Sequence, residues 1–175
     1  LQHIAVDGAK RFLEGGEVAG CYFSVGKPGN LLCVAEGFAT GATIHEATGY
    51  AVAVAFNCGN LEPVARALRE KFPAARLVIC ADDDAATAGN PGITKATEAA
   101  RAVGGLLAVP DFGAERPKDA TDFNDLAAHR GNDAVRACIK AAKEATPEKW
   151  PEPLPLLSAT RAQPYPVDAL PGAIG

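Results

Sequence analysis

The apolar run at residues 77–81 constrains the fold more than any other stretch, because it ends directly in three carboxylates, Asp82, Asp83 and Asp84. Five consecutive apolar residues are typical of a strand buried on both faces of a parallel sheet. Open α/β sheets bind their ligands at the carboxyl ends of such strands. Adjacent carboxylates repel one another, and Mg²⁺ is a hard cation that carboxylate oxygens bind. The stretch therefore predicts a divalent-cation site at the end of a buried strand.

A second apolar run, residues 31–35, ends in Glu36 and Gly37 and so repeats this design. If the two strands are neighbours, their carboxyl ends meet at one edge of the sheet, and Glu36 faces the aspartates. A Glu at one strand end and an Asp-x-Asp at another provide the ligands of a metal site for phosphoryl-transfer chemistry.

Apolar runs alternate with stretches of helical periodicity from residue 31 onward. We expect strands at residues 31–35, 51–56, 77–81 and 106–109, and helices at about 40–47, 61–72, 91–103, from 121, and 133–144. Asn60 and Asn90 stand where side chains cap helix N-termini, and Pro91 suits a first helical position. This order predicts an α/β fold whose mainly parallel sheet is flanked by helices.

Residues 1–30 follow a different pattern, with short β-branched and aromatic stretches between glycines. We expect these stretches to form antiparallel strands that are added to the edge of the sheet.

The composition changes after Thr146, where seven of the thirteen prolines lie. Such a segment is typical of an extended linker. We therefore expect one folded domain at residues 1–145 and a Pro-rich linker at residues 146–175 that leads to a further, C-terminal domain. The sequence begins without Met and in the middle of a pattern, so we also expect it to be part of a longer protein.

Charge, cysteines and hydropathy argue against several classes of protein. A formal net charge of −4 is unlike that of a free-standing nucleic-acid binder, which is usually basic. The five cysteines form no Cys-x-x-Cys pair, which argues against a zinc ribbon and for a reducing, cytoplasmic setting. No apolar run approaches the roughly 20 residues of a membrane helix, and no secretory signal is visible. We expect no membrane partner.

The two strand-end motifs belong to a wider pattern that resembles the Toprim domain, and most of all that of phage- and plasmid-type (bacterial-type) DNA primases. The resemblance covers about residues 1–145 and rests on residues 7–13, 36–40, 47–49, 55–57, 60–61, 82–84, 90–92 and 122–125. Glu-Gly alone is a weak motif. A strand ending in Glu-Gly and a second strand ending in Asp-x-Asp at this separation are a specific combination. The resemblance implies a Toprim-like, Rossmann-like α/β fold.

The resemblance also implies roles for three carboxylates. Asp82 and Asp84 match the Asp-x-Asp that binds divalent metal, Mg²⁺ or Mn²⁺, and Asp83 falls at its variable position. Glu36 matches a Glu that contacts metal and acts as general acid or base during nucleotide transfer. The alternative is a solvated surface cluster of acidic residues. Adjacent like charges directly after buried strands are energetically costly, and this argues against a merely solvated cluster.

Asp122 and Asp125 match further acidic residues that help to hold metal in bacterial primases. They can equally be the start of a helix, because Asp favours helix N-termini through capping and the helix dipole. Lys118 is a candidate phosphate contact, and a solvated loop lysine is the alternative.

Three smaller residues are candidates for contacts with nucleotide or phosphate. Gly37 and Gly59 can let backbone N–H groups approach a phosphate, or they can simply serve turns. Asn57 ends an expected strand beside the site, where it can contact the active centre or serve a turn.

The resemblance implies metal-dependent nucleotidyl transfer: RNA primer synthesis from nucleoside triphosphates on single-stranded DNA, in replication of a phage, plasmid or other mobile element. A helicase, or a helicase domain of the parent chain, is the expected protein partner.

Two alternatives remain open: a nuclease or topoisomerase component, and a non-catalytic metal-binding module that tethers a helicase. A topoisomerase needs a nucleophilic tyrosine, and none of Tyr22, Tyr50 and Tyr165 is a persuasive candidate. Nucleases of the family carry an ATPase, and no G-x-x-x-x-G-K-[ST] motif of an ATPase occurs in the sequence.

Overall fold

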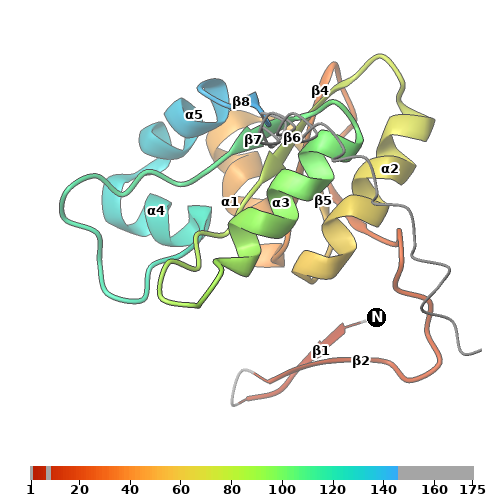
Figure 1. Cartoon of the computed structure of the whole chain (residues 1–175), viewed down its shortest axis with the longest axis horizontal. Helices are drawn as coiled ribbons and strands as arrows, with labels where there is room; N and C mark the ends of the chain where they lie inside the picture. Colours follow the sequence, from red (N-terminus) through yellow and green to blue (C-terminus); the bar gives the residue numbers. More distant parts are fainter. Residues whose placement is uncertain (1, 7–8, 146–175) are drawn as a thin grey trace, which may run out of the picture.

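A six-stranded sheet lies at the centre of the computed structural model, which describes residues 2–6 and 9–145 (Figure 1). Its strands are β3 (Phe23–Val25), β4 (Leu31–Ala35), β5 (Ala51–Val54), β6 (Arg76–Cys80), β7 (Leu106–Ala108) and β8 (Lys143–Glu144), in the order β3-β5-β4-β6-β7-β8. The four inner strands are parallel, and the two edge strands are antiparallel to their neighbours. The mainly parallel α/β sheet predicted from the sequence is confirmed.

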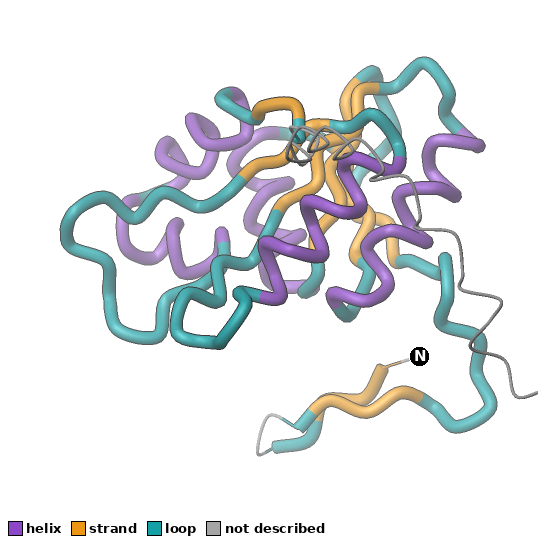
Figure 2. Tube along the Cα trace, viewed as in Figure 1, coloured by secondary structure: helices purple, strands orange, loops and turns teal. Residues whose placement is uncertain are grey.

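Helices cover both faces of this sheet (Figure 2). Helices α2 (Leu61–Lys71) and α3 (Pro91–Ala102) pack on one face, together with the short 3-10 helix η1 (Cys58–Asn60). Helices α1 (Phe38–Thr48), α4 (Phe123–Arg130) and α5 (Asn132–Lys140) pack on the other. Side chains alternate between the two faces along each strand: Val34 and Ile79 face α2 and α3, whereas Cys33 and Val78 face α1, α4 and α5.

Strands β4 and β6 are adjacent and are buried on both faces, which explains their unbroken apolar sequences. Their register pairs Leu32 with Leu77 and Val34 with Ile79. The residues that follow the two strands therefore emerge side by side at the carboxyl edge of the sheet. This is the neighbour relationship that the Glu36 and Asp82 motifs required.

The expectation for residues 1–30 is wrong in part. Strand β3 does join the sheet edge beside β5, but β1 (Gln2–Ile4) and β2 (Lys10–Phe12) pair only with each other, in a separate two-stranded hairpin (Figure 1). Almost every residue of the hairpin is exposed. A strand with no apolar face to bury gains little from joining a packed sheet.

Other departures from the expected elements lie at their ends. Helix α5 ends at Lys140 instead of continuing to residue 144, and the last residues form β8 beside β7. A two-residue polar strand, Lys143–Glu144, has too little apolar pattern to be recognised from sequence. Strand β5 ends at Val54, two residues earlier than expected, and Phe56 adopts a positive φ of 68°.

The two expected helix caps have different outcomes. Asn90 caps α3 as predicted, with its side chain accepting a hydrogen bond from the Ile93 N–H and with Pro91 in the first turn. Asn60 is not a side-chain cap of α2. Its amide instead donates to the carbonyls of Cys21 and Ala55, and it accepts from the N–H of Gly20. A buried amide is satisfied best by fixed backbone groups, and only the tertiary structure brings these groups together.

The Pro-rich linker expected at residues 146–175 lies outside the described residues. Within the described part, no helix has both the length and the apolar character needed to cross a membrane.

Candidate functional site

Carboxylates from two central strand ends and from one helix start gather at the carboxyl edge of the sheet. Glu36 follows β4, Asp82 and Asp84 follow β6, and Asp122 precedes α4. All four residues are partly buried. The Asp82 Oδ1 atom is buried and has no hydrogen-bond partner within the described residues. A buried carboxylate oxygen without a partner carries an uncompensated desolvation cost.

Burial and repulsion between these carboxylates change their protonation. Burial, and after it the negative charges of Glu36, Asp122 and Asp84, together raise the pKa of Asp82 to about 8, while the charge of Lys10 opposes the shift. Burial and then Asp84 also raise the pKa of Glu36, against the effects of Lys10 and of a hydrogen bond from the backbone of Cys58. Like charges that approach one another in this way favour protonation of one of the carboxylates or binding of a cation.

Asp84 is held by the start of α3. Its Oδ2 accepts a hydrogen bond of 3.1 Å from the N–H of Gly92, and its own N–H donates to Asn90 Oδ1 at 3.0 Å. A Cβ atom at position 92 would lie 2.2 Å from the carbonyl oxygen of Asp82. Only glycine therefore lets the positive end of this helix approach the aspartate loop so closely.

Asp122 is the N-cap of α4 and also a member of the acidic site. Its Oδ1 accepts from the N–H of Asp125, and its Oδ2 accepts from the hydroxyl of buried Thr40 at 2.6 Å. Asp122 can therefore be both a helix cap and a site residue. Its Oδ1 caps α4, and the negative charge of its carboxylate acts on Asp82.

Asp125 has a different environment. Its Oδ2 accepts from the N–H of Thr121 at 2.8 Å and from that of Asp122 at 3.4 Å, which completes a reciprocal capping box. The capping role accounts for this carboxylate, and metal ligation by Asp125 stays a prediction.

The residues fit a metal such as Mg²⁺ in charge and in donor type. Among the described residues, no three His, Cys, Asp or Glu side chains are arranged closely enough to enclose a metal ion. Mg²⁺ does not require such a cage, because it usually keeps several waters and binds one or two carboxylates together with substrate phosphates. The unpartnered Asp82 Oδ1 and the surrounding repulsion are what a cation would relieve.

The candidate phosphate contacts lie in three places. Gly37 precedes α1 without a side-chain cap, so the first N–H groups of that helix are open at the site edge. Asn57 serves a turn, since its Oδ1 accepts from the N–H of Asn60 at 2.9 Å, and Gly59 lies exposed within η1. Lys118 is exposed in the loop before α4. Phosphate binding by these residues stays a prediction.

Sequence reasoning gave no role to two basic residues that the structure places at the site. The charge of Lys10, on β2, lowers the pKa of both Glu36 and Asp82. The hairpin that carries it contacts the site end of the sheet through a 3.3 Å hydrogen bond from Gln2 Nε2 to the carbonyl of Phe56. Lys10 lies inside the motif at residues 7–13, which was its only signal.

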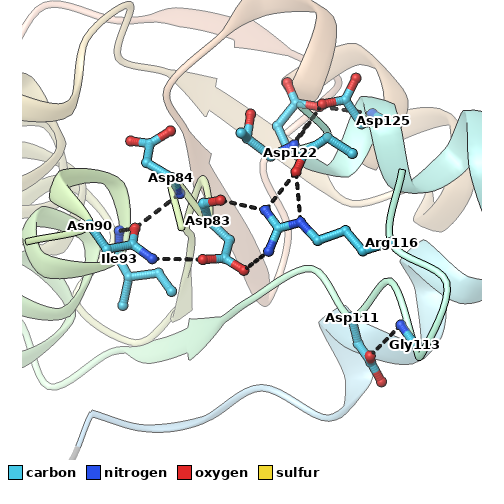
Figure 3. A network of polar contacts seen from close by, with 11 residues as sticks. Asp83, Asp84, Asn90, Ile93, Asp111, Gly113, Arg116, Asp122 and Asp125 are labelled. Carbon is cyan, nitrogen blue, oxygen red and sulfur yellow. Dashed lines mark hydrogen bonds and ion pairs between the residues drawn. The ribbon is translucent and has the colours of Figure 1, made fainter. Parts of the chain in front are cut away.

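The second is Arg116, from the polar loop at residues 111–120. Its guanidinium contacts Asp83, as Figure 3 shows. Asp83, the residue assigned to the variable position of Asp-x-Asp, is therefore paired with a cation from another loop.

Comparison with known proteins supports the resemblance stated from the sequence. The model of the Toprim domain family matches residues 31–133. The chain is 47% identical over 121 residues to one DNA primase TraC of Escherichia coli, which covers 64% of this chain and 11% of that protein. It is 43% identical over 137 residues to a second DNA primase TraC of Escherichia coli, which covers 73% of this chain and 9% of that protein. The chain thus spans about a tenth of the length of these relatives.

Among solved structures, the chain is similar to the RNA polymerase domain of the Mycobacterium tuberculosis primase DnaG in complex with a double-stranded DNA oligomer with a 6-nucleotide overhang. The TM-score is 0.41 and the sequence identity 22%, and the match covers 66% of this chain and 36% of that one.

Proposed function

Since this chain belongs to the Toprim domain family, we propose that it is the catalytic domain of a DNA primase that joins ribonucleotides into RNA primers on single-stranded DNA. The observation that carries the proposal is the convergence of four carboxylates, those of Glu36, Asp82, Asp84 and Asp122. One buried oxygen of Asp82 has no hydrogen-bond partner among residues 2–6 and 9–145. The names of the TraC relatives support the reaction class.

Asp82 and Asp84 hold Mg²⁺ or Mn²⁺ in this proposal, and Asp122 adds a third carboxylate from α4. When bound, the metal supplies charge for the attacking hydroxyl and for the leaving pyrophosphate. Asp125 supports the site from its capping box and is a candidate outer ligand.

Glu36 has a separate role, because it stands alone at the end of its strand. Burial and the charge of Asp84 raise its pKa, which makes its carboxylate a stronger base for proton transfer. It can accept the proton of the attacking hydroxyl while the aspartates stay ionised around the metal.

The nucleoside triphosphate binds at the edge of this acidic site in our proposal. The open N–H groups that follow Gly37 and the exposed Lys118 provide phosphate contacts, and Asn57 and Gly59 shape the neighbouring turn. Lys10 offsets part of the negative charge near Glu36 and Asp82.

The setting we propose is replication of a phage, plasmid or other mobile element in the cytoplasm, with a helicase or a helicase domain of the parent chain as partner. The chain spans about a tenth of the length of its primase relatives, and in this proposal other parts of the parent protein contribute to template binding.

The test is primer synthesis by the longer parent protein, measured as incorporation of labelled ribonucleotides on single-stranded DNA with and without Mg²⁺. Asp82→Asn and Asp84→Asn should abolish synthesis, and calorimetry on the present chain should show weaker metal binding for both. Asp133→Asn is the matched control, because this exposed aspartate lies on α5, outside the acidic site, and pairs with Arg136. Normal synthesis by Asp82→Asn would refute the catalytic role. Metal binding without any primer synthesis by the wild-type parent would instead favour a non-catalytic tethering module.

A further inference from the structure

Asp83 lies between Asp82 and Asp84 in sequence, but its carboxylate is paired with Arg116. Its Oδ1 accepts a 2.6 Å hydrogen bond from Asn90 Nδ2, and its Oδ2 pairs with Arg116 Nη1 at 2.5 Å (Figure 3). Its side chain is only 17% exposed. The middle residue of Asp-x-Asp is therefore a structural anchor and not a member of the acidic site.

Arg116 links this anchor to the segment before α4. Its Nη2 donates to the carbonyls of Asp83 at 2.6 Å and Ala120 at 2.5 Å, and its Nε also donates to Ala120. The guanidinium lies over the ring of Phe112, 4.7 Å from the ring centroid. Its planar fork of donors thus joins two loops that are 33 residues apart in sequence.

The next residues continue this link into the site. The N–H of Asp83 donates to the carbonyl of Thr121 at 2.7 Å, and Asp122 follows immediately. Asp122 caps α4, and its Oδ2 accepts a hydrogen bond from Thr40 in the first turn of α1, which follows the end of β4. The contacts of Arg116 are made with Asp83 and Ala120, the residues next to Asp82 and Thr121, so they brace this backbone hydrogen bond between the two segments.

We propose that Arg116 is a positioning residue, which holds Asp122 beside Asp82 through its contacts with Asp83 and Ala120 and so sets the carboxylate spacing for divalent metal. The inference rests on the proposed function, since it assumes that the acidic site binds metal. Arg116 does not itself touch the metal. Its role is that of a residue that hydrogen-bonds to the segments carrying the metal ligands. Loss of such outer partners typically weakens metal affinity about 10–100-fold.

The experiment is calorimetric titration of the chain with Mg²⁺ and with Mn²⁺, at a temperature well below unfolding. Arg116→Gln should bind both metals about 10-fold more weakly or worse. Arg116→Lys should recover only part of the affinity, because an ammonium group cannot contact both loops with the same fork of donors. Asp83→Asn should weaken binding as well, and the double variant should be little worse than Arg116→Gln alone, as expected for residues acting as one unit.

Arg136→Gln is the matched control, because Arg136 also joins two elements. It pairs with Asp133 and donates from Nε to the carbonyl of Ala47 at 2.9 Å, near the end of α1 that lies away from Glu36. This variant should lower the melting temperature without changing metal affinity. That result would separate positioning from general stabilisation.

Wild-type metal affinity in folded Arg116→Gln would overturn the inference while leaving the proposed metal site intact. Full recovery by Arg116→Lys would also overturn it, since charge alone would then suffice. If the wild-type chain binds neither metal, the proposed function fails first and this inference fails with it.

Discussion

Thr40 donates a 2.6 Å hydrogen bond from its hydroxyl to Asp122 Oδ2, although 82 residues separate the two in sequence. Thr40 lies in the first turn of α1, immediately after the Glu36-Gly37 motif, and Asp122 caps α4. This contact brings the last acidic residue of the site to the strand end that carries Glu36. It joins the two helices that follow the site on one face of the sheet.

Without metal, the stability of the domain should fall as the pH rises from about 4 to about 8. The folded pKa of Asp82, about 8, lies above its ordinary value of 3.8. The stability contributed by protonated Asp82 is therefore fully present below the ordinary value and is lost as the pH rises through the folded one. One proton corresponds to a slope of up to about 1.4 kcal/mol per pH unit.

Urea denaturation of wild type and Asp82→Asn between pH 4 and 9 measures this effect. Asp82→Asn should be more stable than the wild type at pH 8 without metal and less responsive to pH. Parallel pH profiles for the two proteins would contradict the prediction.

Glu36→Gln should separate catalysis from metal binding. If Glu36 exchanges a proton with the attacking hydroxyl, primer synthesis by the parent protein should fall about 100-fold or more. Metal affinity should change far less, since Asp82 and Asp84 remain. Ribonucleotide incorporation and calorimetry provide the two readouts. Glu46→Gln, an exposed residue of the same helix region, is the control. Near-normal synthesis by Glu36→Gln would show that Glu36 is not catalytic.

Asp122 and Asp125 should give opposite results. Asp125→Ala removes half of the capping box and should cost about 1 kcal/mol of stability, with metal affinity nearly unchanged. Asp122→Asn keeps a side-chain oxygen for the cap but removes the charge, so stability should change little while metal affinity falls. Thermal melts and calorimetry of both variants test this contrast. A larger affinity loss for Asp125→Ala than for Asp122→Asn would reverse the assignment.

Gly92→Ala should destabilise the domain by about 1–3 kcal/mol, because the new Cβ would lie 2.2 Å from the carbonyl oxygen of Asp82. The aspartate loop would have to move, so metal affinity should fall with stability. Gly29→Ala is the control, because a Cβ there meets nothing within 4 Å. Denaturant midpoints that are equal for Gly92→Ala and wild type would mean that the loop moves freely.

The sequence by itself determined the sheet and the ends of its central strands. Unbroken apolar runs at residues 31–35 and 77–81 can only be accommodated between two layers of helices, and β4 and β6 are indeed buried on both faces. Burial fixes where each strand stops, so Glu36 and Asp82 had to emerge at the carboxyl edge. These are local consequences of periodicity and hydrophobicity, and the sequence carries them directly.

Only the tertiary structure decided how the loop side chains divide among their roles. Three adjacent aspartates are equivalent in sequence, yet Asp83 pairs with Arg116, whose guanidinium comes from a loop 33 residues away. The buried Oδ1 of Asp82, in contrast, has no hydrogen-bond partner in the described part of the chain. Asp125 caps its own helix, whereas Asp122 is also bound by Thr40. The exposed β1–β2 hairpin and the two-residue β8 likewise have too few apolar residues for their strand pairing to be predicted from the sequence. Such choices depend on contacts between distant segments, and those contacts exist only once the buried strands have brought the segments together.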